Sequence, residues 1–210
     1  MTAPTSIRRA LLLALASAVL LKIGALTVCT AGRCRVPEID AALLITLHDL
    51  RSPALDDFFS AITWAGSMYV LLPLALALAI ADRRAITLGQ RGFVVVALAS
   101  QWGAIHVAKM LVARPRPTLF EPLIALPADG SFPSAHAAQI TAFACAWLLR
   151  PGTHARWSAA LPLCALVASV CLSRLYLQVH YPSDVIYAVA ATVLWVVALR
   201  ALFDGRERSA

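Results

Sequence analysis

The chain has 210 residues, of which 60% are hydrophobic and 14% charged, and its formal net charge is +7. Soluble domains are about 45–50% apolar, so this composition and a mean hydropathy of +0.78 exclude an ordinary soluble domain and indicate a membrane protein. The basic surplus fits the charge bias of membrane loops and does not indicate a nucleic-acid-binding protein. We expect one membrane-embedded domain over residues 1–210.

Six apolar runs have about the length of transmembrane helices, roughly 17–25 residues. The predicted fold class is therefore all-α, a polytopic bundle of six transmembrane helices. The first run follows Arg8 and Arg9 and is longer than the roughly 7–15-residue core of a signal peptide, so we expect it to be retained as an anchor. The six predicted spans cover residues 7–28, 64–81, 93–113, 134–149, 157–173 and 184–203.

Residues 38–63 mix apolar side chains at helical spacing with acidic ones, and Ser52-Pro53 is typical of a break followed by a new helix. We expect an interfacial amphipathic segment that leads into the second span. The Asp56-Asp57 pair is interpreted as a solvated face or as helix N-terminal charge. In the preceding loop, Cys29 and Cys34 form either a disulfide or two free thiols, and the sequence leaves both open.

Lysines and arginines in the short loops predict the orientation. With the N-terminus inside, ten of these cations fall on the inner side and seven on the outer side. Four of the seven outer cations belong to polar clusters with a separate explanation. Without them, ten inner cations stand against three outer ones. We therefore expect both termini on the cytoplasmic side. The four set apart are Lys109, Arg114, Arg116 and Arg174.

Three polar clusters fall on this outer side. "KMLVARPRP" closes the third span, "PSAH" opens the fourth, and "SRLYLQVHYPSD" connects the fifth to the sixth. Each cluster alone has a structural explanation, because interfacial cations extend to water and Pro-Ser pairs start helices. Ionisable residues at membrane depth are costly, however, and their convergence on one end of one bundle indicates a functional site.

The cations of these clusters predict a site for a phosphoryl group. Lys109, Arg116 and Arg174 supply positive charge, and an arginine can bind a phosphate through two parallel hydrogen bonds. Ser134 and His136 stand at the start of the fourth span, where free backbone N–H groups also attract anions.

The remaining residues of the clusters are suited to nucleophilic chemistry. His180 and Asp184 share a face if their segment is helical, and meet across a turn if Pro182 breaks the helix; in both cases the carboxylate orients the imidazole. His180 is then a candidate nucleophile and His136 a candidate general acid. Two histidines and an aspartate are also a metal-ligand set, but three neighbouring cations would repel a metal ion, so we expect no metal.

The three clusters resemble the three-part signature of the type 2 phosphatidic acid phosphatase (PAP2) superfamily. All ten fixed residues match in order and spacing, and the motifs cover residues 109–184. The six-span layout extends the likeness over nearly the whole chain. The matching motifs are Lys109–x6–Arg116-Pro117, Pro133-Ser134-x-His136 and Ser173-Arg174-x5-His180-x3-Asp184.

The resemblance implies a metal-independent phosphatase without a cofactor. In the mechanism it implies, His180 attacks phosphorus and forms a phosphohistidine, and Asp184 orients His180. His136 protonates the leaving oxygen and then activates water. The resemblance assigns the phosphate oxygens to Lys109, Arg116, Ser134, the Ala135 N–H and Arg174.

Two residues in or near the motifs, Ala135 and Arg114, do not follow the family pattern. Ala135 stands where the family usually has glycine, and we expect an ordinary helix start that tolerates its methyl group. Arg114 lies outside the motif register, and we expect it to meet a lipid headgroup or a second phosphate. Among the other polar residues, His106 is expected to be a structural hydrogen-bond partner, and Tyr176 and Tyr181 to be interface anchors.

Together these observations predict a lipid phosphate or diphosphate phosphatase in a bacterial cytoplasmic membrane, with its site facing the periplasm. Undecaprenyl diphosphate is the first expected substrate, followed by phosphatidylglycerophosphate or phosphatidate and then lipid A. Transfer of the phosphoryl group to another lipid stays open, as does the oligomeric state. The superfamily's vanadate-dependent haloperoxidases are soluble, which six spans disfavour, and a non-catalytic phosphate or lipid carrier would need neither histidine.

Overall fold

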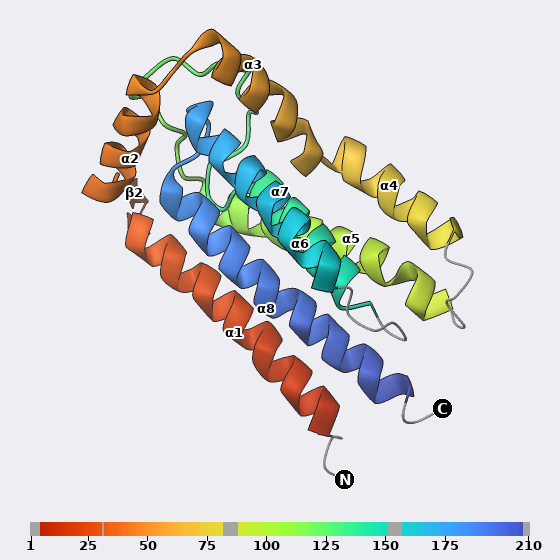
Figure 1. The fold of residues 1–210 in the computed structure, drawn as a ribbon. Coiled ribbons are helices and arrows are strands. Elements are labelled where there is room, and N and C mark those ends of the chain that lie inside the picture. The colour runs from red at the N-terminus through yellow and green to blue at the C-terminus, as the bar shows by residue number, and fades with distance from the viewer. Residues whose placement is uncertain (1–4, 31, 82–87, 151–156, 208–210) are drawn as a thin grey trace.

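The computed structural model describes residues 5–30, 32–81, 88–150 and 157–207, which form a bundle of helices with a two-stranded hairpin (Figure 1). Successive long helices run in alternating directions. In chain order the elements are α1 (Thr5–Val28), β1 (Cys29–Thr30), β2 (Arg33–Cys34), α2 (Glu38–Asp49), α3 (Pro53–Ile62), the 3-10 helix η1 (Thr63–Gly66), α4 (Met68–Ala81), α5 (Leu88–Val112), α6 (Ala135–Leu148), α7 (Trp157–Tyr176) and α8 (Pro182–Glu207).

Four of the predicted spans are confirmed as helices long and apolar enough to cross a membrane. These segments are Thr5–Val28, Gln90–Val112, Ser158–Tyr176 and Pro182–Phe203. The predicted span over 64–81 belongs to a helix pair, Pro53–Gly66 and Met68–Ala81, that meets this criterion only when joined and is bent by 49°. The predicted span over 134–149 corresponds to α6, which has 14 residues. The described part of the chain thus holds four such spans, or five with the bent pair.

The amphipathic segment over 38–63 folds as two short helices at one end of the bundle. The break falls at the predicted place, because Ser52 caps α3 by accepting a hydrogen bond from the Leu55 N–H (3.4 Å) and Pro53 occupies the first turn. Before α2, β1 and β2 form an antiparallel hairpin that pairs Cys29 with Cys34, and these two cysteines form a disulfide. Gly32 turns the hairpin with a φ of 75°, in the left-handed region that favours glycine.

The short helix α6 lies inside the bundle, packed against α4, α5, α7 and α8. Its sequence "AHAAQITAFACAWL" is rich in alanine, and small side chains let neighbouring helices approach closely. Nine of its 14 residues are buried, including Ile140 and Phe143, which belong to the largest apolar cluster of the core together with Phe93 and Leu98 of α5. The core therefore fixes the position of α6 and of the polar residues at its start.

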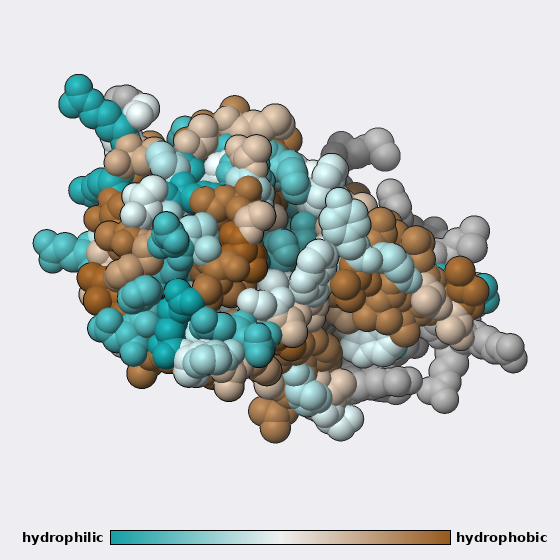
Figure 2. All heavy atoms as spheres, turned by 90° about the horizontal axis from the view of Figure 1, so that it is seen from above, coloured by the Kyte–Doolittle hydropathy of each residue, from teal (hydrophilic) through white to brown (hydrophobic). Residues whose placement is uncertain are grey.

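The three motif clusters lie at the end of the bundle that carries α2 and α3 (Figure 1). Figure 2 looks onto the molecule from this direction and shows hydrophilic residues gathered toward the left, the α2 side. The cations predicted for the opposite, inner side lie mostly in or beside segments outside the described residues, among them Arg83, Arg84, Arg156 and Arg208. The orientation in the membrane therefore stays a prediction.

Candidate functional site

Four helix ends bring the predicted site residues together. Lys109 lies in the last turn of α5 and Arg174 in the last turn of α7. His136 lies in the first turn of α6 and Asp184 in the first turn of α8. His180 lies in the short connection between α7 and α8, whose backbone is fixed by hydrogen bonds from the N–H groups of residues 179 and 180 to the Arg174 carbonyl (both 3.2 Å).

These helix ends enclose a cavity of about 720 Å³, which we call the polar cavity. Six of the eight predicted site residues line it, and the other two, Ser134 and Asp184, are completely buried behind its wall. Residues from α4 and α5 extend it sideways. Its lining residues are Met68, Tyr69, Leu72, Ala99, Trp102, His106, Lys109, Arg116, Pro127, Asp129, Ala135, His136, Gln139, Arg174 and His180.

His180 and Asp184 meet across the start of a helix, the second of the two predicted arrangements. Pro182 is the first residue of α8, and Asp184 Oδ2 accepts the Tyr181 N–H at 2.9 Å. His180 Nδ1 lies 3.4 Å from the same oxygen, within ion-pair distance but not aligned for a hydrogen bond. On the other side of the ring, Nε2 lies 3.4 Å from an Arg116 Nη1–H. Because arginine only donates, this contact favours an unprotonated Nε2 and a proton on Nδ1.

Burial makes His180 a neutral imidazole. Its side chain is 2% exposed. Burial, together with the positive charges of Arg174, Lys109 and Arg116, lowers the pKa of His180 well below its usual value. The neutral form has a free lone pair, here on Nε2 toward the cavity, which is the form that can act as a nucleophile.

Arg114 does not meet a headgroup or a second phosphate, so that expectation is wrong. Its side chain is 1% exposed and is paired with two buried carboxylates, Asp184 Oδ1 at 2.5 Å and Asp40 Oδ2 at 3.1 Å. Asp40 also accepts hydrogen bonds from the Ser183 N–H (2.9 Å) and hydroxyl. We call Arg114, Asp40, Ser183 and Asp184 the buried ion-pair network. It fixes the carboxylate behind His180, because a buried charge is stable only with such partners.

Asp129 bridges two of the three predicted phosphate-binding cations. Its carboxylate lies 2.6 Å from Arg116 Nη2 and 3.1 Å from Lys109 Nζ. Lys109 also donates to the Gly130 carbonyl, and Arg116 Nε donates to the Asp129 carbonyl at 3.1 Å. Although partial burial opposes it, the charges of Lys109 and Arg116 lower the pKa of the Asp129 carboxyl. An anion in the polar cavity must therefore compete with a carboxylate that is 38% exposed.

Several buried polar atoms around the cavity have no partner. Among the described residues these include Ser134 Oγ and Arg174 Nε, while Arg174 Nη1 donates to the Thr63 hydroxyl. An unsatisfied buried donor costs about 1–3 kcal/mol, so an anion that reached either atom would supply a partner that the protein does not. Backbone N–H groups of the first turn of α6, which lack helical partners, add further donors.

Ala135 is the first residue of an ordinary helix, as expected. Among the described residues, the non-glycine residues with positive φ are Ala113 and Gln178. The α6 N-terminus therefore does not require glycine, and the methyl group of Ala135 is accommodated.

Other expectations need correction. Tyr176 and Tyr181 are not interface anchors: both are buried, Tyr176 donates its hydroxyl to Asp56 (2.6 Å), and the Arg114 guanidinium lies 4.0 Å from the centre of the Tyr181 ring. Asp56 lies in the first turn of α3, as the helix N-terminal alternative predicted, and it also pairs with Arg51 at 2.8 Å. His106 makes the expected structural bond, to the Trp102 carbonyl (2.8 Å), and in addition lines the polar cavity.

Sequence reasoning missed Asp40 and Asp129. Asp40 lies in an amphipathic segment, where an acidic residue is usually solvated, and no local pattern separates it from its exposed neighbours. Asp129 lies in the loop "PADGSFP" directly before the second motif. An acidic residue beside an anion-binding motif was the available signal.

Comparison with known proteins identifies the family of the chain. The PAP2 superfamily profile matches residues 91–208. A curated relative, decaprenylphosphoryl-5-phosphoribose phosphatase of Mycobacterium tuberculosis, is 36% identical over 148 residues, which are 67% of this chain and 75% of the relative.

Two solved structures share the fold. The PAP2-type phosphatidylglycerolphosphate phosphatase of Bacillus subtilis superposes with a TM-score of 0.77 at 21% identity, covering 91% of this chain and 96% of that structure. Aquifex aeolicus LpxE superposes with a TM-score of 0.66 at 23% identity, covering 78% of this chain and 95% of that structure. Because the profile covers more than half of the residues and includes all three motifs, the chain belongs to the PAP2 superfamily of membrane phosphatases.

Proposed function

We propose that this protein hydrolyses a terminal phosphate from a membrane lipid through a phosphohistidine at His180, without a metal ion. The observation that carries the proposal is the position of His180 in the polar cavity. Its Nδ1 faces Asp184 at 3.4 Å and its Nε2 faces the cavity beside Arg116, also at 3.4 Å. A neutral imidazole oriented by a carboxylate and facing cationic donors is suited to attack a phosphoryl group.

In the proposed reaction, His180 Nε2 forms a bond to phosphorus while the bond from phosphorus to the lipid oxygen breaks. His136 donates a proton to that oxygen. A water molecule then attacks the phosphohistidine, His136 accepts its proton, and inorganic phosphate leaves with His180 restored. Charge on the transferring group is stabilised by Lys109, Arg116, Arg174, the Ser134 hydroxyl and the Ala135 N–H.

A lipid tail has a direct route into the polar cavity. Met68, Tyr69 and Leu72 of α4 and Trp102 of α5 line the side of the cavity away from the loops. Tyr69 and Trp102 are 86% and 45% exposed, on surfaces of helices apolar enough to lie in a membrane. A phosphate can therefore rest on the cations while its tail leaves between α4 and α5 into the bilayer.

Two polyprenyl substrates are proposed. Undecaprenyl diphosphate is the substrate expected from the sequence. The M. tuberculosis relative is named for a phosphoribose carried on decaprenyl phosphate, which favours a sugar phosphate on a similar carrier as the second. A volume of about 720 Å³ leaves space for a group between the reacting phosphate and the tail. Phosphatidylglycerophosphate, phosphatidate, lipid A and phosphotransfer to a second lipid are the alternatives that the assay must separate.

The proposed topology has six crossings in a bacterial cytoplasmic membrane, with both termini inside and the polar cavity facing the periplasm. The bent α3–α4 pair and the short α6 supply the two crossings beyond the four long helices. The disulfide of Cys29 and Cys34 lies at the same end as the cavity, and disulfides persist in oxidising compartments outside the cytoplasm.

The test is phosphate release by the purified protein in detergent with EDTA. The panel contains undecaprenyl diphosphate, decaprenylphosphoryl-5-phosphoribose, phosphatidylglycerophosphate, phosphatidate and lipid A. His180→Ala is the inactivating variant. His48→Ala is its matched control, because His48 stacks on Phe120 with ring centres 3.6 Å apart and does not line the cavity.

We expect release from one of the two polyprenyl lipids, retained in His48→Ala and lost in His180→Ala. Release from another member of the panel alone would replace the proposed substrate and keep the chemistry. Activity that EDTA removes, or that His180→Ala retains, would contradict the proposed mechanism.

A further inference from the structure

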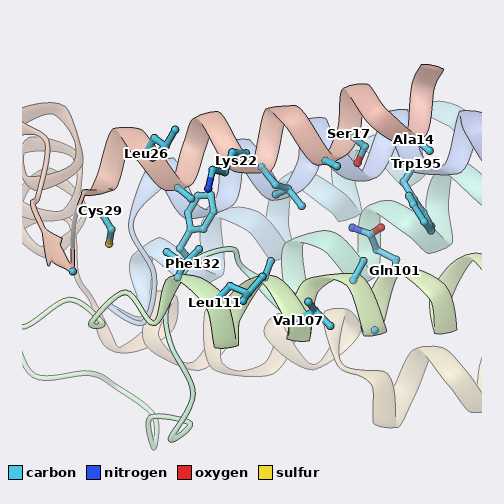
Figure 3. Close-up of a pocket in the computed structure, with 18 residues that line it drawn as sticks. Ala14, Ser17, Lys22, Leu26, Cys29, Gln101, Val107, Leu111, Phe132 and Trp195 are labelled. Carbon is cyan, nitrogen blue, oxygen red and sulfur yellow. The ribbon is translucent and has the colours of Figure 1, made fainter. Parts of the chain in front are cut away.

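A second cavity lies on the opposite face of α5. It has a volume of about 630 Å³, lies between α1, α5 and α8, and shares no lining residue with the polar cavity (Figure 3). Trp102, His106 and Lys109 face the polar cavity, whereas Ala104 and Ala108 of the same helix face this one. We call it the α1–α5 groove.

The groove opens toward the surroundings of the bundle. Leu26 of α1 and Leu111 of α5 lie on its two sides and are 52% and 81% exposed. Both helices belong to the segments long and apolar enough to cross a membrane. The groove therefore faces lipid and accommodates an apolar chain without rearrangement of the helices.

Among the residues that the structure describes, Lys22 is the only ionisable side chain that lines the groove. It lies six residues before the end of α1, about 9 Å along the helix axis. The side chain points into the groove toward Phe132 (Figure 3), is exposed, and has no hydrogen bond or ion pair with any described residue. A cation at this depth is costly without an anionic partner, and such residues indicate a binding function.

The other polar groups of the groove are already satisfied within the bundle. The Ser17 hydroxyl donates to the Ala191 carbonyl at 2.8 Å, the Gln101 amide to the Thr192 hydroxyl at 2.7 Å, and the Trp195 indole to Ser100 at 3.0 Å. The unpaired charge of the groove, among the described residues, is therefore that of Lys22.

We propose that the α1–α5 groove binds an anionic phospholipid from the leaflet at the α2–α3 end, with its phosphate on Lys22 and an acyl chain extending toward Trp195. A single cation above an apolar groove is complementary to this combination of headgroup and chain. A transmembrane helix of a second copy would leave the Lys22 charge without a counter-charge in hydrocarbon. The bound lipid would contact Phe132, two residues before Ser134, and so touch the loop that precedes the second motif.

The test uses quenching of Trp195 fluorescence by brominated lipids. The full chain is reconstituted in phosphatidylcholine nanodiscs that contain increasing fractions of brominated phosphatidylglycerol or brominated phosphatidylcholine. The difference between wild type and Trp195→Phe isolates the Trp195 signal. Lys22→Gln removes the cation and Lys22→Arg keeps it. Arg33→Gln is the matched control, because Arg33 is an exposed cation of β2 outside the groove.

We expect half-maximal quenching at an about fivefold lower fraction of the anionic lipid than of phosphatidylcholine, as one lysine near an anionic lipid would give. Lys22→Gln should abolish this preference, whereas Lys22→Arg and Arg33→Gln should keep it. Ala104→Phe, which fills the groove, should reduce quenching by both lipids.

Equal quenching by the two lipids in the wild type would overturn the proposal, as would a preference retained in Lys22→Gln or undiminished quenching in Ala104→Phe. Disulfide cross-linking of Ala18→Cys between two copies in the same nanodiscs, with Trp195 protected from both lipids, would assign the groove to a second copy instead. Quenching and cross-linking do not depend on phosphatase activity. A negative result here would therefore overturn the lipid-binding proposal without bearing on the proposed reaction.

Discussion

Arg114 and Arg116 are two residues apart in one loop, and each is paired with aspartate, yet their environments differ. Arg114 and its partners Asp40 and Asp184 are each 0–1% exposed. Arg116 is 7% exposed, and its partner Asp129 is 38% exposed. The first pairing is closed to solvent on both sides, and the second has one partner that water and ligands can reach.

This difference in burial separates an arginine that supports the site from an arginine that can bind a ligand. A buried pair is fixed, since removing either partner leaves an uncompensated charge in a low dielectric. A partly exposed pair is weak and exchangeable, because solvent screens it. Arg114 therefore holds the carboxylate behind His180, whereas in the proposed reaction Arg116 exchanges Asp129 for a phosphate.

The largest expected effect on stability belongs to Arg114. In Arg114→Gln, Asp40 and Asp184 lose their shared cation, and we expect a loss of about 3–5 kcal/mol in the free energy of unfolding. For a chain of this size that lowers the melting temperature by roughly 6–20 °C. Tryptophan fluorescence of the detergent-solubilised protein measures it. Arg114→Lys, which retains the charge, should lose less, and an unchanged melting temperature in Arg114→Gln would remove the distinction between the two arginines.

Arg116→Gln should show the opposite pattern. The loss of one charged donor to the transferring phosphoryl group should lower kcat/KM by about 10²–10³. The melting temperature should change less than in Arg114→Gln, because a partly exposed ion pair, screened through its exposed partner Asp129, contributes about 0–1 kcal/mol. Phosphate release measures the change in kcat/KM, and thermal unfolding of the same preparation measures the change in melting temperature. If Arg116→Gln had a melting temperature as low as that of Arg114→Gln and normal turnover, Arg116 would have a structural role like that of Arg114 instead of a role in binding.

The lowered pKa of His180 predicts a dependence of stability on pH. The unfolded chain binds a proton at His180 below about pH 6.5, the usual histidine value, whereas the folded protein binds it only at lower pH. His180 thus costs no stability above pH 6.5 and lowers stability progressively as the pH falls below it. The melting temperature of the wild type should therefore decline more steeply below pH 6.5 than that of His180→Asn. Parallel curves for the two proteins would contradict a neutral, buried His180.

The smallest expected effect belongs to Asp129. Asp129→Asn removes the carboxylate that competes for Lys109 and Arg116, so KM and the inhibition constant of inorganic phosphate should fall by up to about fivefold with kcat nearly unchanged. Glu121→Gln, an exposed acid of the same loop, is the control. A large fall in kcat with unchanged KM would instead make Asp129 part of the catalytic machinery.

Features set by local sequence were predicted correctly. The apolar runs located α1, α5, α7 and α8, and Ser52-Pro53 located the break before α3, because span length, capping and proline geometry act over a few residues. The predicted site residues were likewise expected to converge, and six of the eight line the polar cavity.

Features that depend on tertiary packing could not be predicted from the sequence. Nothing near Arg114 in the sequence identifies Asp40, 74 residues earlier, as its partner, so its guanidinium was assigned to a lipid instead. Tyr176 pairs with Asp56 across 120 residues for the same reason. The interior position of α6 could not be predicted either, because this 14-residue helix is stabilised by burial within the bundle rather than by its own length.

The most direct test of the central claim is to trap the covalent intermediate. The protein would be mixed for milliseconds with its substrate labelled with ³²P in the reacting phosphate, quenched in alkali and analysed by mass spectrometry of peptides that contain residue 180. We predict a phosphoryl group that is stable in alkali, labile in acid, located on His180 and absent from His180→Ala. Turnover without any phosphoryl group on His180, or with one on another residue, would contradict the account.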